Sequence, residues 1–204
     1  MENNFEQLIG VVPLESAKIN DYVQFGKNAW KVIGVEDGLK LLLSKECMVL
    51  DFDWVLEQDT EKKATDGIGD DLVDEDFAAI FCPDSIIDEE VDNVEEYEAI
   101  RKYFREWFSE KYFTKAELGK IVPHKTVGDH IFLLDELEVE QYLPEKEERI
   151  ATTSALIKVV ERPWLLRLNQ FEESQLLVDI DGGIIQLPEG CVCDTFRPAV
   201  WVKT

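Results

Sequence analysis

The sequence predicts an α+β fold in which a largely antiparallel, twisted sheet is flanked by helices. Segments with the two-residue alternation of β-strands lie near both ends of the chain, and segments with amphipathic helical spacing lie between them. No glycine-rich phosphate-binding loop or other motif of the nucleotide-binding α/β classes is present. Strands that are segregated from helices in this way favour an antiparallel sheet.

The first expected element is a β-meander over residues 21–44. Its first strand ends at Gly26, and "AWKVIGVE" follows with alternating apolar residues. The pair Asp37–Gly38 is a turn signal, after which "LKLLLS" returns. We therefore expect three consecutive strands joined by short turns.

An acidic segment separates the meander from the helices. Residues 57–98 contain 17 acidic residues and 2 lysines, a net charge of −15 out of −23 for the whole chain. The first part, 57–76, has too few apolar residues to form a core, so we expect a loop there. Its "DGIGDDLVDED" lacks the acid spacing of a calcium-binding loop. We interpret residues 1–204 as a single domain with an acidic insertion at about 57–98.

Helices are expected next. An apolar stripe with spacings of three and four residues is formed by Val94, Tyr97, Ile100, Phe104 and Phe108. Thr114 with Glu117, and Asp135 with Glu138, have the spacing of helix-capping boxes. A short strand, "DHIFLLD", is expected between the two boxes, and Pro144 ends the last helix.

The last third of the chain is again predicted to be β. "PWLLRL" and "QLLVDI" have strand patterns, and "DGG" at 181–183 is a hairpin turn before "IIQL". "FRPAVWV" is the final strand, and its Pro198 suggests an edge position or a bulge.

Two arginines fall inside these strand patterns. The candidates for a binding role are Trp54, Trp164, Arg167, Arg197 and Trp201, of which Trp54 is the tryptophan most expected to be exposed. A buried guanidinium requires hydrogen-bonded partners. We expect backbone carbonyls, a tryptophan face, or Asp179 and Asp181 to supply them, which would give both arginines a structural role. The alternative is a clamp for an anionic ligand.

The cysteines and histidines do not have the spacing of a metal site. They are Cys47, Cys82, Cys191, Cys193, His124 and His130, and no two cysteines are separated as in C-x2–4-C. Cys191 and Cys193, two residues apart, would be too distant on a strand for an unstrained disulfide. We expect no metal, no cofactor and no disulfide.

Five pieces of the chain together carry a resemblance to a known family. They are "DYVQFGKNAWKVIGVEDGLKLLLS", "RKYFREWFSEKYFTKAELGKI", "DHIFLLDELEVEQYL", "WLLRL" and "FRPAVWVK". In this order they resemble a bacterial family of uncharacterised domains, over residues 19–56 and 99–204. The resemblance implies no activity, because none is established for the family.

The closing pattern of that family is in turn similar to the C-type-lectin-like fold, which includes the formylglycine-generating, sulfatase-modifying enzymes. This similarity implies a twisted antiparallel sheet, two flanking helices and long loops that carry any site. Residues 163–168, "PWLLRL", lack one tryptophan and the serine of the family's W-W-L-R-S. The E-P-N, Q-P-D and W-N-D motifs of calcium-dependent lectins are absent, and Cys191 and Cys193 lack the i,i+5 spacing of the enzymes' copper-binding pair.

Charge and hydropathy exclude several classes of partner. A net charge of −23 opposes direct binding to nucleic acid or to anionic membranes. No apolar run is long enough for a transmembrane helix and the first residues do not form a signal peptide, so we expect a cytoplasmic location.

The sequence therefore favours a non-catalytic binding or protein-interaction module for an unknown protein or small ligand, in an oligomeric state left open. One alternative is an enzyme derived from the sulfatase-modifying type. The other is an acidic mimic of nucleic acid, which would require the segment 57–98 to be ordered.

Overall fold

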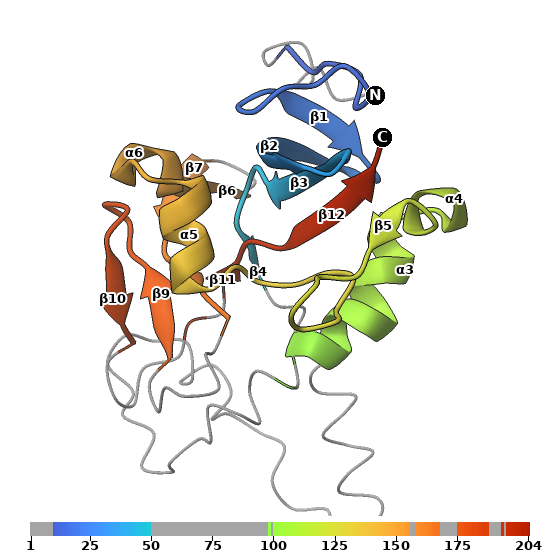
Figure 1. Cartoon of the computed structure of the whole chain (residues 1–204). Coiled ribbons are helices and arrows are strands. Elements are labelled where there is room, and N and C mark those ends of the chain that lie inside the picture. Colours follow the sequence, from blue (N-terminus) through green and yellow to red (C-terminus); the bar gives the residue numbers. More distant parts are fainter. Residues whose placement is uncertain are drawn as a thin grey trace, which may run out of the picture.

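The fold is α+β with mostly antiparallel sheets and a few short helices, as the sequence predicts (Figure 1). The structure is a computed structural model that describes residues 10–49, 98, 100–155, 158–167, 175–187, 193 and 195–204. The first sheet is entirely antiparallel and contains, in spatial order, β1 (Tyr22–Phe25), β2 (Asn28–Glu36), β3 (Leu39–Ser44), β12 (Ala199–Lys203) and β5 (Ile121–Val122).

The predicted meander is confirmed as β1, β2 and β3. Gly26 has a φ of 64° at the first turn, where glycine avoids the clash that a Cβ would cause. Asp37 and Gly38 form the second turn with φ values of 50° and 76°. The β2–β3 register shifts between Val32 and Gly34, so a β-bulge divides the alternation that the sequence pattern indicates.

The second sheet is built largely from the last third of the chain. Its spatial order is β10 (Ile184–Gln186), β9 (Leu176–Val178), β8 (Trp164–Leu165), β11 (Thr195–Phe196) and β4 (Met48–Val49). The β8–β11 pair is parallel and the others are antiparallel. The predicted 181–183 turn joins β9 and β10. A separate hairpin of β6 (Ala151–Ala155) and β7 (Lys158–Arg162) was not among the predicted elements.

The helices are short. A helical segment at residues 100–103 continues into the π-helix η2 (Phe104–Phe108) and then into α3 (Ser109–Tyr112). The other helices are α4 (Lys115–Leu118), α5 (Glu136–Tyr142) and α6 (Lys146–Arg149). Both predicted capping boxes are confirmed, at the N-termini of α4 and α5. Pro144 follows the end of α5 as expected.

Two hydrophobic clusters cover the two faces of the first sheet. Leu42 and Val200 belong to the cluster that contains Phe104 of η2. Leu43, next to Leu42 in β3, belongs to the other cluster, which contains α5. Successive strand residues point to opposite faces, so one sheet is buried on both sides. Figure 1 shows α5 and α3 on opposite sides of β3 and β12.

Two details of the predicted strands are wrong. "DHIFLLD" forms only an isolated bridge, between Phe132 and Ala199, although its apolar residues alternate between the two clusters as predicted. Pro198 is not on an edge strand, because it lies between β11 and β12, where the chain passes from the second sheet to the first. Its carbonyl accepts a hydrogen bond from the Ser44 amide at 2.9 Å, and its missing N–H interrupts no ladder there.

Several predictions concern residues outside the described ranges. They are Trp54, Cys82, Cys191 and the acidic insertion at 57–98, apart from Glu98. In the part of the chain that is described, no helix is long and apolar enough to cross a membrane.

Candidate functional site

The described candidates from the sequence lie in the interior. Trp164, Arg167, Arg197 and Trp201 are each at most 8% exposed. The structure brings Trp164 and Arg197 together, whereas Arg167 and Trp201 have other partners.

Arg197 is bound by backbone carbonyls and by an aromatic face. Its Nε donates to the Ser44 carbonyl at 3.0 Å, and its Nη1 donates to the Arg149 carbonyl at 3.4 Å. Its guanidinium carbon lies 5.2 Å from the centre of the Trp164 ring. Burial lowers the pKa of Arg197 to about 10, which leaves the side chain charged at neutral pH. These contacts match the partners expected for a structural arginine.

Arg167 has carboxylate partners that the sequence did not indicate. Its Nη2 donates to Asp135 and, at 3.0 Å, to Glu138, so the capping box of α5 also holds the arginine. The expected partners Asp179 and Asp181 are wrong, because their carboxylates accept amides within the β9–β10 turn. Arg167 follows β8 rather than lying within it.

A histidine extends this ion group. His124 Nε2 lies 2.6 Å from Glu138 Oε1, while its Nδ1 accepts the amides of Thr126 and Val127 at 3.3 Å each. Because Nδ1 is an acceptor, the hydrogen bonds place the proton on Nε2, which donates to Glu138. His124 is buried. Arg167 pairs with Asp135 and Glu138, and Glu138 also contacts His124, so the four side chains form one connected group.

Trp201 packs in the cluster on the α5 side of the first sheet. Its ring meets Tyr142 edge to face at a centroid distance of 6.3 Å. Tyr142 in turn donates its hydroxyl to Glu36 at 2.6 Å. Burial and Glu36 raise the pKa of Tyr142, so the phenol stays protonated. Trp201 therefore has the contacts of a core residue.

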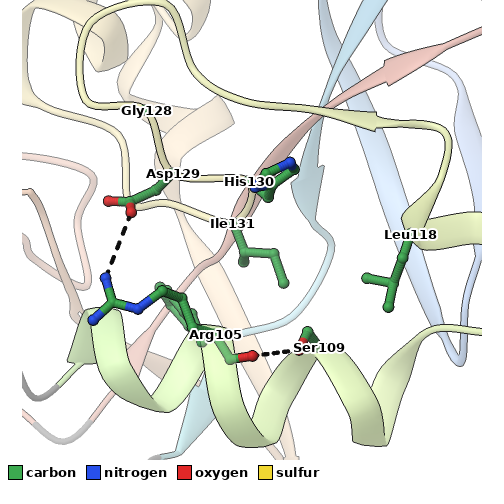
Figure 2. A pocket seen from close by; sticks show the side chains of 8 residues that line it. Arg105, Ser109, Leu118, Gly128, Asp129, His130 and Ile131 are labelled. Atoms are coloured by element: carbon green, nitrogen blue, oxygen red, sulfur yellow. Dashed lines mark hydrogen bonds and ion pairs between the residues drawn. The ribbon is translucent and has the colours of Figure 1, made fainter. Parts of the chain in front are cut away.

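None of these candidate residues lines the cavity of about 260 Å³ that lies between the η2–α3 helix and the segment 128–131 (Figure 2). It is lined by Phe104, Arg105, Ser109, Leu118, Gly128, Asp129, His130 and Ile131. Phe104 and Ile131 are buried and belong to the hydrophobic cluster beneath the cavity. One wall is therefore part of the core.

Charged groups gather at one end of this cavity. Asp129 accepts from Nε and Nη2 of Arg101 at 2.7 and 3.1 Å. The hydrogen bond to Asp129 is also the main reason that the pKa of Arg101 is raised. Arg105 Nη1 lies 3.8 Å from Asp129, and the Arg105 side chain is 53% exposed. Figure 2 shows Arg105 and Asp129 at one end, Leu118 at the other, and Ile131 between them.

No local pattern in the sequence indicates this cavity. Arg105 lies on the polar side of the helical stripe, and Asp129 follows a glycine in a turn. They meet only through tertiary packing. His130, which the sequence offers as a metal ligand or as a base for a cysteine, is exposed at the cavity.

The described cysteines are buried. Burial raises the pKa of the Cys47 thiol to about 12, which keeps it protonated. Cys193 contacts the hydroxyl of Thr195 at 3.4 Å. Within the described ranges, no three residues of the types His, Cys, Asp and Glu are grouped to hold a metal ion.

Comparisons of the chain with protein-family models, with curated proteins and with solved structures found no match.

Proposed function

We propose that the chain is a non-catalytic binding module whose ligand occupies the cavity between the η2–α3 helix and residues 128–131. The observation that supports this proposal is the lining of the cavity: one wall belongs to the apolar core, and charged groups lie at one end. Binding sites for small molecules have this composition. The volume of about 260 Å³ is just below the usual range of about 300–1,000 Å³, so the ligand is small.

Asp129 and Ser109, two polar residues that line the cavity, have partners within the protein. Both Asp129 oxygens accept from Arg101, and the Ser109 hydroxyl donates to the Arg105 carbonyl at 2.7 Å. Ser109 is therefore not activated by a neighbouring base, as a nucleophile would have to be. The sulfatase-modifying alternative depends on a reactive cysteine, and the high pKa of Cys47 makes that thiol unreactive. These contacts favour binding over catalysis.

The family resemblance belongs to the same proposal. We propose that the chain is a member of the bacterial family of uncharacterised domains, on the five sequence pieces that occur in its order. The C-type-lectin-like relationship is supported by the antiparallel first sheet, which has helices on both faces. The cytoplasmic location stays a prediction from the sequence.

Titration with benzamide, followed by NMR of methyl-labelled protein, tests whether the cavity binds ligands. Benzamide is a small, flat and neutral probe. We expect the methyl signals of Leu118 and Ile131 to shift, because both line the cavity. Leu137 and Ile180, which are exposed elsewhere, should not shift.

A cavity-filling variant makes the test specific. Ser109→Leu should abolish the shifts because the larger side chain enters the cavity, whereas Glu110→Leu changes the exposed neighbour and should leave them intact. The proposal fails if neither benzamide nor its anionic analogue benzoate shifts either methyl group, or if the shifts survive Ser109→Leu.

A further inference from the structure

We infer that the ligand of this cavity is a small organic anion, with a carboxylate at Arg105 and an apolar body that extends toward Leu118. This inference rests on the proposed binding function. It adds the charge of the ligand and its orientation, which the function alone does not specify.

The guanidinium of Arg105 retains N–H donors for a ligand. Its contact with Asp129 is 3.8 Å, which is too long for a hydrogen bond, and Asp129 already accepts two hydrogen bonds from Arg101. In the described part of the chain, Arg105 has no other ion-pair partner. A guanidinium has five N–H donors in a planar fork that matches a carboxylate. Arg105 is thus the available charged donor of the cavity.

Charges of both signs lie at this end of the cavity. Arg101 and Arg105 carry two positive charges against the carboxylates of Asp129 and of Glu98, which pairs with Arg101 at 2.6 Å. Residues 100–120 contain six basic and three acidic residues, a net charge of +3 in a chain of −23. Charges farther away than about 8 Å are largely screened at physiological salt. The net charge of −23 of the whole chain therefore does not exclude an anion at Arg105.

A cationic ligand fits less well. A cation at Asp129 would lie beside the positive charges of Arg101 and Arg105, which pair with this carboxylate at 2.7 and 3.8 Å. An anion at Arg105 would disturb only the 3.8 Å ion pair with Asp129, which is not a hydrogen bond.

The positions of the lining residues indicate the orientation of the ligand. Figure 2 places the Arg105–Asp129 pair and Leu118 at opposite ends of the cavity, with Ile131 between them. A carboxylate bound by Arg105 would direct the rest of the ligand along Ile131. Ile131 and Leu118 are apolar, so burial of an apolar group is favourable in that direction. The ligand is therefore amphipathic, with its charge at one end.

Benzoate and benzamide separate this inference from the binding function, because the two probes have nearly the same shape and differ in charge. We expect benzoate at pH 7 to bind about tenfold more tightly than benzamide, since hydrogen bonds to a charged group are stronger. Methyl shifts of Leu118 and Ile131 give both dissociation constants. Added salt should weaken binding of benzoate and not of benzamide.

Arg105→Gln should remove the preference for benzoate, so that the dissociation constants of benzoate and benzamide become similar. Lys102→Gln removes one positive charge from the same helix away from the cavity lining, so it should keep the preference. The inference is overturned if both probes bind equally, or if Arg105→Gln keeps the preference, while benzamide binding would still support the proposed function. If neither probe shifts these methyl groups, both proposals fail.

Discussion

Arg197 and Trp164 donate to the same acceptor, the backbone carbonyl of Arg149. The Trp164 Nε1 is 3.0 Å from this oxygen and the Arg197 Nη1 is 3.4 Å from it, while the guanidinium lies over the indole ring. Arg149 is itself buried and donates its Nε to the Leu143 carbonyl at 2.7 Å. This arrangement links the end of α6, β8 and the β11–β12 connection through interior hydrogen bonds.

Replacing Arg197 by lysine should reduce stability. An ammonium cannot reproduce the planar fork that reaches both the Ser44 and the Arg149 carbonyl, so the Ser44 carbonyl would lose this donor and the Arg149 carbonyl would keep only Trp164 Nε1. We expect Arg197→Lys to lower the free energy of unfolding by about 2–4 kcal/mol, measured by urea denaturation. The exposed Arg105→Lys is the control and should change it by less than about 0.5 kcal/mol. If the two variants lower the free energy of unfolding by the same amount, the structural role of Arg197 is contradicted.

Arg167 and Glu138 should be energetically coupled. Arg167→Met leaves two carboxylates near His124 without their cation, so we expect a loss of about 3–5 kcal/mol. A double-mutant cycle with Glu138→Gln isolates the pair, and its coupling energy should be at least about 1 kcal/mol. The exposed pair Lys102–Glu106, at 3.9 Å, should give less than about 0.5 kcal/mol. A coupling energy near zero between Arg167 and Glu138 would contradict the hydrogen bond between them.

Local signals in the sequence were sufficient for much of the fold. The turn at Asp37–Gly38 and the capping boxes depend on residues at most three positions apart, so they could be predicted without tertiary information. The partners of Arg167 could not be predicted in this way, because Glu138 lies 29 residues away.

The cavity could not be predicted for the same reason. Asp129 and Arg101, which set its charged end, are 28 residues apart. Neither belongs to a motif with a known spacing, and the side chains that line the cavity look like ordinary members of a helix and a turn. Of the predicted apolar stripe, Ile100, Phe104 and Phe108 are buried as expected, but the stripe does not indicate which residues line the cavity.

Gly26 and Gly38 provide a matched pair of substitutions. Both have positive φ, of 64° and 76°, so alanine is conformationally strained at each. A Cβ at Gly26 would also overlap the carbonyl oxygen of Tyr112, whereas a Cβ at Gly38 meets nothing within 4 Å. We expect Gly38→Ala to cost about 1 kcal/mol and Gly26→Ala at least about 2 kcal/mol more. Thermal and urea unfolding measure both, and equal losses would contradict the predicted clash.

The buried thiol of Cys47 should make stability fall at high pH. Its pKa is raised from 9.0 to about 12, so the folded protein retains a proton that the unfolded chain loses above pH 9. The stabilisation is complete below pH 9 and is lost as the pH rises toward 12, by at most about 1.4 kcal/mol per pH unit.

The difference between wild type and Cys47→Ala isolates this contribution from other groups that titrate in the same range. Unfolding free energies measured between pH 8 and 11 should converge as the pH rises, because only the wild type carries the thiol. If the free energies of unfolding of the two proteins differ by the same amount at every pH, the fold does not protect the Cys47 thiol from ionisation.

The position of β12 has a consequence for the order of folding during synthesis. β12 pairs with β3 on one side and with β5 on the other, and Ala199 is matched with Leu43, far earlier in the chain. The ribosome releases the meander long before this strand, so β3 emerges with an unpaired edge. The central sheet therefore cannot be completed until Lys203 has been synthesised, and the nascent chain carries an aggregation-prone edge until then.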